Sequence, residues 1–421
     1  MKNIIYRSIV SLLAISVIMW STAAYATNGI RLIGFGPVQR GMGGVGVGLP
    51  RDAAATVTNP AGITEVGGRV DVGLTVAVPD SVYSASSAFG QITVNDRVML
   101  NDAPPILIPA LGFTTPITED LFVGIGAYGV SGVCADYEEN LYQNVTYVKY
   151  TCTKISPVIA YEPVDGISIG AGPVMDIAEL TYRAGGIAQL RHPNGTAVGW
   201  GWALGALFKP FTLMEFIPLP ESLPREFLTV GFAYESEQYF NDFSYDLDQG
   251  VDKLELNQPQ VVSWGIGLEP IKRFRFGFDM EWINWSQVLG HMMPSYSVNG
   301  TNASQWDVDW DDQLVYKLGA EFDVLEDVIV DKLTLRVGYN YGQHPLIASR
   351  AFENIALPSI TEHHITCGFG IDITENIEFN GAFVYAPPVT FHARNIGTQF
   401  INDVQTSTSM YSFDAGLTYK F

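Results

Sequence analysis

Residues 408–421, the last stretch of the chain, alternate between apolar and polar side chains. Tyr411, Phe413, Ala415, Leu417, Tyr419 and Phe421 share one parity, and Ser412, Asp414, Gly416, Thr418 and Lys420 share the other. A period of two predicts a β-strand with one apolar and one polar face. In an exported chain, repeated strands of this kind that end on an aromatic residue indicate a barrel in an outer membrane.

The first residues of the chain predict export. Lys2 and Arg7 precede an apolar run from Ile9 to Trp20, and Ala24-Tyr25-Ala26 has the pattern of a cleavage site. Such a run is too short for a transmembrane helix, and no later stretch approaches the roughly 18 consecutive apolar residues that a helical span needs. We therefore expect a signal peptide at 1–26.

The same alternation recurs along the rest of the chain. For example, Arg336 and Gly338 interleave with Leu335, Val337 and Tyr339. We predict an all-β fold, a transmembrane antiparallel barrel of about fourteen strands. The predicted strands are 68–79, 105–116, 121–134, 146–161, 166–181, 198–209, 226–240, 257–269, 273–287, 309–323, 332–343, 360–373, 376–390 and 406–421.

Short and long connections alternate between these strands, as expected for short periplasmic turns and long outer loops. Long polar connections include 182–197 and 241–256, and the Pro-rich link 210–225 is an exception on the periplasmic side. Residues 27–67 instead form a Gly-rich stretch that retains apolar residues such as Ile33 and Phe35. A solvated tail would be more polar, so we expect a plug inside the lumen at 27–67 and the barrel at 68–421.

Charge and cysteine content narrow the class of protein further. The chain carries 44 acidic and 23 basic residues, a net charge of −21, which argues against nucleic-acid binding. Cys134 and Cys152 flank a polar loop in a compartment that permits oxidation, so they form either a disulfide or two separate thiols. No spacing resembles a metal site, no nucleophile elbow is present, and no cofactor is expected.

Several motifs, in order along the chain, resemble the FadL/TodX family of outer-membrane channels for long-chain fatty acids and other hydrophobic compounds. They are Arg40-Gly41-Met42-Gly43-Gly44-Val45, Asp52-Ala53-Ala54-Ala55, Asn59-Pro60-Ala61-Gly62, Ala127-Tyr128-Gly129, Tyr234-Glu235-Ser236-Glu237, Trp282-Ile283-Asn284-Trp285-Ser286 and Leu335-Arg336-Val337-Gly338-Tyr339. The Asn-Pro-Ala element is the most specific of them, and the match spans the whole mature chain.

The resemblance implies a monomeric fourteen-stranded barrel in a Gram-negative outer membrane, without catalysis or energy input. It implies that Asn59, Pro60 and Ala61 belong to an N-terminal hatch, and that Tyr128 and Gly129 lie near a kink in the third strand. Hydrophobic ligands such as fatty acids, alkanes or aromatic hydrocarbons would bind beside the hatch and leave sideways into the outer leaflet, among lipids and lipopolysaccharide.

Cations on the lumen parity and in the plug are candidate partners for a ligand carboxylate, since charge-assisted hydrogen bonds are strong. The candidates are Arg31, Arg40, Arg275, Lys317 and Arg336. The alternative is a neutralising network, because acidic residues such as Asp279 and Glu321 share the same strands. A water-filled porin for small polar solutes remains the alternative function, and the apolar plug argues against it.

Overall fold

The computed structural model describes residues 27–87, 99–100, 105–137, 147–184, 190–214, 216–220, 222–247, 250–290, 295–297, 307–326, 332–394 and 401–421. The signal peptide predicted at 1–26 lies outside these ranges. Within them, no helix is long and apolar enough to cross a membrane.

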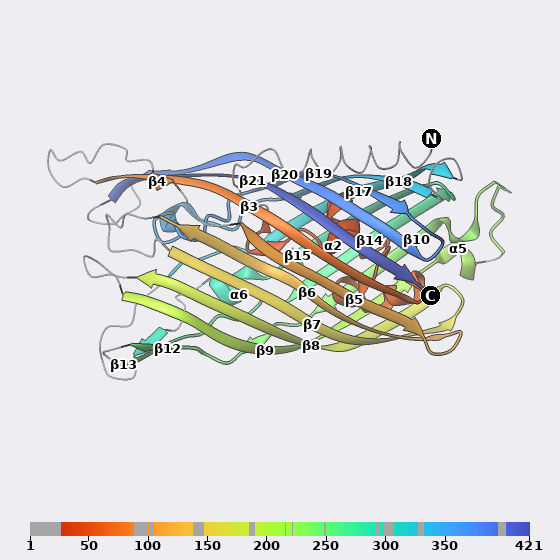
Figure 1. Ribbon diagram of the computed structural model, residues 1–421, viewed down its shortest axis with the longest axis horizontal. Coiled ribbons are helices and arrows are strands. Elements are labelled where there is room, and N and C mark those ends of the chain that lie inside the picture. The colour runs from red at the N-terminus through yellow and green to blue at the C-terminus, as the bar shows by residue number, and fades with distance from the viewer. Residues whose placement is uncertain are drawn as a thin grey trace.

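Fourteen antiparallel strands of the described chain pair with their neighbours in sequence order and close into a barrel (Figure 1). The last strand, β21, pairs with the first, β3, along almost its whole length, from Ile401↔Ser87 to Lys420↔Arg69. The strands are β3 (Arg69–Ser87), β5 (Ile106–Pro116), β6 (Leu121–Asp136), β7 (Tyr147–Val164), β8 (Ile167–Ala184), β9 (Leu190–Phe208), β10 (Leu228–Glu235), β14 (Val261–Ile271), β15 (Phe274–Ile283), β17 (Gln313–Glu326), β18 (Lys332–Gly342), β19 (His363–Asp372), β20 (Ile377–Arg394) and β21 (Ile401–Lys420).

The barrel is apolar outside and polar inside, as the alternation predicts. In β18, Arg336 is 4% exposed whereas its neighbour Val337 is 59% exposed. Closure leaves no free edge strand in the wall, so backbone groups pair between neighbouring strands as a strand needs in lipid. An apolar outer face and a polar lumen are the features of a membrane barrel.

All fourteen predicted strands are present, with shifted ends. Tight turns close one end of the barrel, and the backbone N–H of Ile117 donates to Leu121 O at 2.7 Å in the first of them. Two predicted loops are wrong. Most of 182–197 is strand, because β8 and β9 continue to pair beyond Leu180, and 241–256 folds into the hairpin β12 (Phe243–Leu247) and β13 (Gly250–Leu254). In both segments the strands continue to pair through their backbones, although the alternation of apolar and polar residues that predicts strands is weak there.

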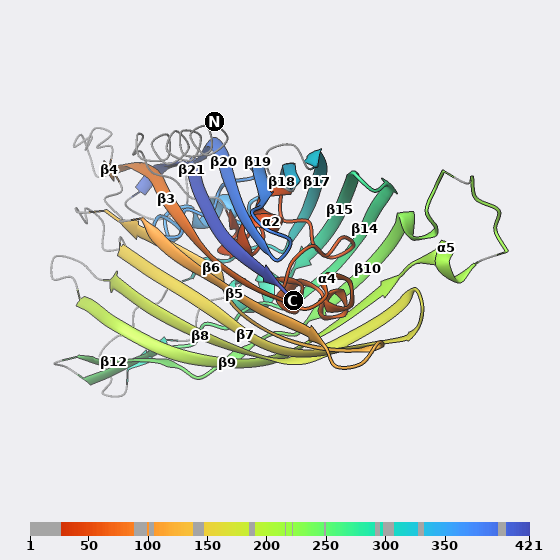
Figure 2. The same ribbon diagram turned by 45° about the vertical axis from the view of Figure 1, so that its right-hand side comes forward.

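The remaining strands and helices are short. They are β1 (Thr27–Asn28), β2 (Arg31–Leu32), β4 (Met99–Leu100), β11 (Tyr239–Phe240) and β16 (Ser295–Ser297), together with α2 (Gly36–Gly41), α3 (Ala55–Thr58), η1 (Pro60–Gly62), α4 (Ile63–Val66), α5 (Pro210–Leu213), η2 (Arg225–Phe227), α6 (Trp285–Leu289) and η3 (Ala348–Arg350). The link that carries α5 projects from the same end of the barrel as the C-terminus (Figure 2).

Residues 27–66 lie within the ring of strands, where Figure 2 shows α2 surrounded by the wall. The backbone of this N-terminal segment contacts inward-facing positions around the barrel. Asp279 of β15 accepts hydrogen bonds from the backbone N–H groups of Gly46, Val47 and Gly48, at 2.7, 2.9 and 3.2 Å. Backbone donors that would otherwise be buried without partners are satisfied in this way.

Candidate functional site

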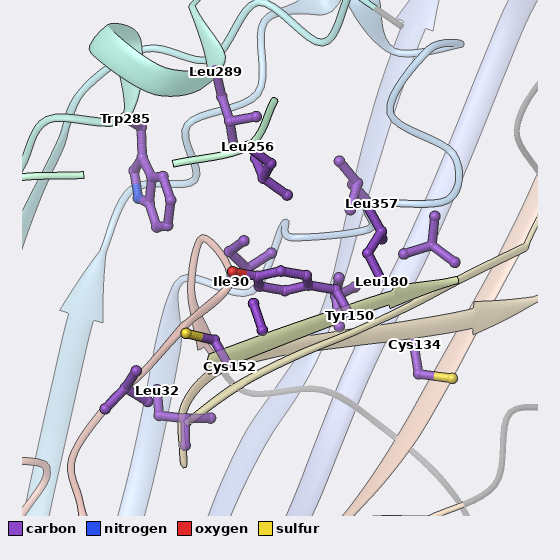
Figure 3. Packing of buried hydrophobic residues seen from close by; sticks show 14 of the residues in the cluster. Ile30, Leu32, Cys134, Tyr150, Cys152, Leu180, Leu256, Trp285, Leu289 and Leu357 are labelled. Atoms are coloured by element: carbon purple, nitrogen blue, oxygen red, sulfur yellow. The ribbon is translucent and has the colours of Figure 1, made fainter. Parts of the chain in front are cut away.

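A cluster of buried apolar side chains lies in the outer part of the lumen. We call it the apolar cluster, and Figure 3 labels ten of its members, with Trp285 and Leu289 of α6 on one side and Tyr150 of β7 on the other. The N-terminal segment contributes Ile30 and Leu32. These side chains make part of an otherwise polar lumen apolar, and apolar surface of this kind is where a hydrophobic molecule is better solvated than in water.

A row of ion pairs crosses the lumen next to this cluster. Arg31 joins two wall acids, with Nη2 at 3.3 Å from Glu235 Oε2 and Nε at 3.4 Å from Glu281 Oε1. Lys154 pairs with Glu235 from the β7 side, and Lys317 Nζ lies 2.8 Å from Glu281 Oε2 on the β17 side. We call these five residues the charge row. It connects opposite walls through the N-terminal segment and presents charged groups across the axial path.

Burial and the two acids act oppositely on Arg31. Burial lowers the pKa of this guanidinium, but the charges of Glu235 and Glu281 outweigh it and raise the pKa above its usual value. Arg31 is therefore a permanent cation held between two anions.

The other predicted carboxylate partners are also paired with acids. Arg40 Nε lies 2.8 Å from Asp414 Oδ1, and Arg336 Nε lies 2.6 Å from Glu321 Oε2. Arg275 Nη1 contacts the same Glu321 at 2.8 Å. Two nitrogens of Arg40, Nε and Nη1, have no hydrogen-bond acceptor among the described residues; Nε lies within ion-pair distance of Asp414, whereas Nη1 is in no ion pair there.

Asn59, Pro60 and Ala61 fasten the N-terminal segment to β8 and β9. The Asn59 side chain accepts from Ala61 N at 3.2 Å and donates to Val47 O at 2.9 Å and to Ala206 O at 3.3 Å. Gly205 allows this approach, because a Cβ there would lie 2.1 Å from Asn59 Oδ1. This contact is a close backbone approach of the kind that requires glycine in a strand.

The third wall strand, β6, separates from β5 halfway along its length. Pairing between them runs from Pro116↔Phe122 to Ala110↔Tyr128 and ends there. Beyond that point β6 has a register irregularity between Gly129 and Ser131 against β7. It then pairs with β2 through Arg31↔Ser131 and a 2.9 Å hydrogen bond from Gly132 N to Ile30 O. The outer half of β6 thus pairs with the N-terminal segment instead of β5.

A cavity of about 140 Å³ lies where β5 and β6 separate. Ile106, Ile108 and Gly129 line it from the wall, and Leu32 and Arg40 line it from the lumen. Tyr128 is buried just below, with its ring centroid 6.4 Å from that of Phe35 in the N-terminal segment. Of the two residues singled out from the sequence, Gly129 lines this cavity and Tyr128 is the last residue of β6 that pairs with β5, while Asn59, Pro60 and Ala61 anchor the segment on β8 and β9.

No disulfide joins Cys134 and Cys152 in the structure, which corresponds to the second of the two alternatives that the sequence left open. The β6–β7 register places Cys134 opposite Lys149 and Cys152 opposite Ser131, so the two residues are not partners across the pair. Their sulfur atoms point in different directions (Figure 3). Although the two cysteines flank one loop in the sequence, they do not lie opposite each other in the paired strands β6 and β7.

Sequence reasoning missed Lys154 and the role of Asp414. Lys154 lies on the inward parity of the predicted strand 146–161, which was the available signal. Asp414 lies on the polar parity of the last strand, but nothing in the sequence indicated Arg40 as its partner. Within the described ranges, no group of three or more His, Cys, Asp or Glu side chains could hold a metal ion.

Comparisons with known proteins agree with this geometry. The model of a family described as outer membrane protein transport protein (OMPP1/FadL/TodX) matches residues 15–421. No curated protein sequence matches the chain.

Several solved structures share the fold. The P. putida toluene transporter TodX has a TM-score of 0.70 at 17% identity, covering 93% of this chain and 99% of that one. A Pseudomonas aeruginosa FadL homologue gives 0.70 at 16% identity, covering 95% and 100%. The Ralstonia pickettii toluene transporter TbuX gives 0.66 at 18% identity, covering 93% and 99%.

Proposed function

Because the chain belongs to the OMPP1/FadL/TodX family of outer membrane protein transport proteins, we propose that it is a passive channel for uncharged hydrophobic molecules. It is an outer-membrane transport protein and not an enzyme. The finer steps of the proposal are the ligand's chemistry, the place where it binds and the route by which it leaves.

The charge of the ligand follows from the compensated cations, which is the observation that carries the proposal. Each of Arg31, Arg40, Arg275, Lys317 and Arg336 already lies within ion-pair distance of at least one buried acid. A ligand carboxylate entering this lumen would lose its hydration without gaining an uncompensated cation, which is costly in a low dielectric. A neutral hydrocarbon, or one carrying a hydroxyl for Arg40 Nη1, meets no such cost.

The apolar cluster supports a binding place in the outer lumen beside the N-terminal segment, which we propose acts as the hatch. A ligand there contacts side chains such as Ile30, Leu32 and Trp285 and leaves water behind. Burial of apolar area is worth about 25 cal/mol per Å², so a small hydrocarbon gains a few kcal/mol at most. Weak binding of this size suits a passive channel, which must also release its cargo.

The charge row and the cavity between β5 and β6 support a sideways route. Continuing along the barrel axis would bring an apolar ligand against Glu235, Arg31 and Glu281, whereas the cavity beside Gly129 is lined by apolar residues such as Ile106 and Ile108. The outer face of the wall there meets lipid, so we propose release into the outer leaflet. A water-filled porin would need an open axial path, and the N-terminal segment occupies it.

Uptake by cells that lack such channels tests the ligand class. We expect cells expressing the protein to take up radiolabelled toluene several-fold faster than cells with an empty vector, and to take up oleate no faster. Barrel folding in the membrane is checked by heat-dependent gel migration in the same samples.

Two outcomes would contradict the proposal. Faster uptake of oleate than of toluene would show that a carboxylate is recognised despite the paired cations. No gain for either, with a folded barrel and faster entry of a small sugar, would support the porin.

A further inference from the structure

The barrel wall has a second irregularity at residues 236–238, next to β9 and separated from β6 by β7 and β8. Pairing of β10 with β9 ends at Glu235↔Ala203 and resumes at Tyr239↔Trp200 in β11. From Glu235 to Tyr239 the chain advances four residues, while the paired strand β9 advances only three, from Ala203 to Trp200. The extra residue makes a bulge. Ser236 N donates to Trp202 O at 2.9 Å and Ser236 Oγ accepts from Trp202 N at 3.0 Å, so the bulge is anchored on β9.

The bulge brings the carboxylate of Glu237 into the wall without a cation. Glu237 is 8% exposed, and Asn257 Nδ2 donates to its Oε1 at 2.9 Å. Gln287 of α6 donates to Oε2. No Lys, Arg or His of the described residues forms an ion pair with it. An ionised group in a membrane wall is costly unless it serves a ligand or a partner.

Aromatic rings surround this carboxylate on the outer face of the barrel. Trp200 and Tyr239 are 58% and 64% exposed, and Trp202 packs on Tyr234 with ring centroids 4.9 Å apart. These four rings line a cavity of about 250 Å³ together with Glu237, Ser236, Gln260 and Gln287. A water occupies roughly 30 Å³ in the liquid, so the cavity accommodates a group of several heavy atoms.

From this geometry we propose that the cavity between β9, β11 and α6 binds an alkylammonium group. Aromatic rings attract an organic cation through their electron-rich faces, and Glu237 supplies the negative charge. A metal ion is less suited, because the walls offer ring carbons where it would need oxygen ligands. An anion is excluded by the carboxylate itself.

The ammonium group has two possible sources, a soluble amine and the headgroup of a lipid. Gln287 belongs to α6, which follows the outer end of β15, so the cavity lies toward the outer rim of the barrel, where Trp and Tyr gather in membrane barrels. Both sources reach that level. The site is separate from the proposed channel, because its exposed rings face outward and not into the lumen.

Saturation-transfer NMR on the full-length protein, in an uncharged maltoside detergent, tests the soluble source. We expect choline methyl protons to receive saturation with a Kd of about 1 mM, while the neutral isostere 3,3-dimethyl-1-butanol does not. Glu237→Gln should weaken choline binding about 10-fold or more. Glu179→Gln removes an exposed, outward carboxylate of the neighbouring strand β8 and should leave binding unchanged.

Native mass spectrometry with added phosphatidylethanolamine or phosphatidylglycerol tests the lipid source. Retention of the ethanolamine lipid alone, lost in Glu237→Gln and kept in Glu179→Gln, supports a headgroup site even if choline does not bind. Equal binding of choline and its neutral isostere, or lipid retention unaffected by Glu237→Gln, would overturn the proposal. So would an absence of binding to both probes by the folded protein.

Discussion

Asn59 illustrates how single side chains hold the N-terminal segment in the lumen. Its three hydrogen bonds join the turn at Ala61, the extended stretch at Val47 and the wall strand β9 at Ala206. The side chain is fully buried, so each group left without its partner after a substitution has no water to replace it.

Replacing Asn59 with alanine should loosen the segment without unfolding the barrel. Two backbone carbonyls and one N–H would lose partners, at about 1 kcal/mol or more each, so we expect local destabilisation of about 3 kcal/mol. Hydrogen exchange at residues 59–66 measures it. Asn194→Ala, at an exposed position of β9, is the control. Unchanged protection in Asn59→Ala would show that the anchor lies elsewhere.

Asp52 makes the segment sensitive to pH. Burial, and then the neighbouring carboxylate of Asp71, raise the pKa of Asp52 from 3.8 to about 7. The folded state therefore favours the neutral acid. Its stabilisation is complete below pH 3.8 and is lost as the pH rises through about 7.

We expect the protection of residues 52–55 against hydrogen exchange to fall by roughly 2 kcal/mol between pH 5 and pH 7, after correction for the intrinsic rate. Asp52→Asn keeps the side chain neutral and should abolish most of this fall. Protection that rises with pH in the native protein, or an equal fall in Asp52→Asn, would refute the assignment.

At the scale of single residues, the sequence indicated which cations are buried but not which acids they pair with. Strand parity predicts the inward side for Arg275, Lys317 and Arg336, which are buried, and Arg31 and Arg40 are buried in the N-terminal segment. Whether Arg40 faced a ligand or Asp414 depended on how the N-terminal segment folds against β21, far away in the sequence. No local pattern records that contact.

At the scale of elements, glycines on the inner face of the wall determine how closely the N-terminal segment docks. Gly205 of β9 lies under Asn59, and Gly170 of β8 lies under Pro60, where a Cβ would be 2.4 Å from the Pro60 carbonyl carbon. Because a valine has no room at either position, the wall and the segment depend on each other.

Gly205→Val should displace residues 59–62 and open an aqueous leak. We expect higher single-channel conductance in planar bilayers than in the native protein. Ala206→Val adds the same side chain one position along, on the outward face of β9, and should leave conductance unchanged. If the conductance of the Gly205→Val variant were as low as that of the Ala206→Val variant, the N-terminal segment would not depend on this contact to seal the barrel.

The strands themselves were predictable, and their irregularities were not. Alternation gave all fourteen, because lipid on one side and polar groups on the other impose a period of two. The separation of β6 from β5 beyond Tyr128 has no such signal. The separation depends on β2, and not β5, pairing with Ser131. Backbone hydrogen bonds of this kind leave no side-chain pattern in the sequence. Gly129 could only suggest a weak point.

For the whole molecule, three features act together. On the proposed function, the apolar cluster would receive a hydrophobic ligand, the charge row would block the axial path, and the cavity at β6 would leave a way through the wall. The N-terminal segment contributes to each, through Ile30, Arg31 and Leu32 respectively. The resemblance found in the sequence implied both the class of channel and sideways release, and the register of the strands adds the place where β5 and β6 stop pairing.

Closing the cavity with a reversible crosslink tests sideways release most directly. A Cβ on Gly129 would lie 3.6 Å from Ile108 Cβ, a separation that suits a disulfide. Ile108→Cys/Gly129→Cys is made in a background where Cys134, Cys152 and Cys367 are alanine, with each single cysteine as a control. We predict that oxidation abolishes toluene uptake by the double variant alone and that reduction restores it. Undiminished uptake through a fully crosslinked barrel would contradict release between β5 and β6.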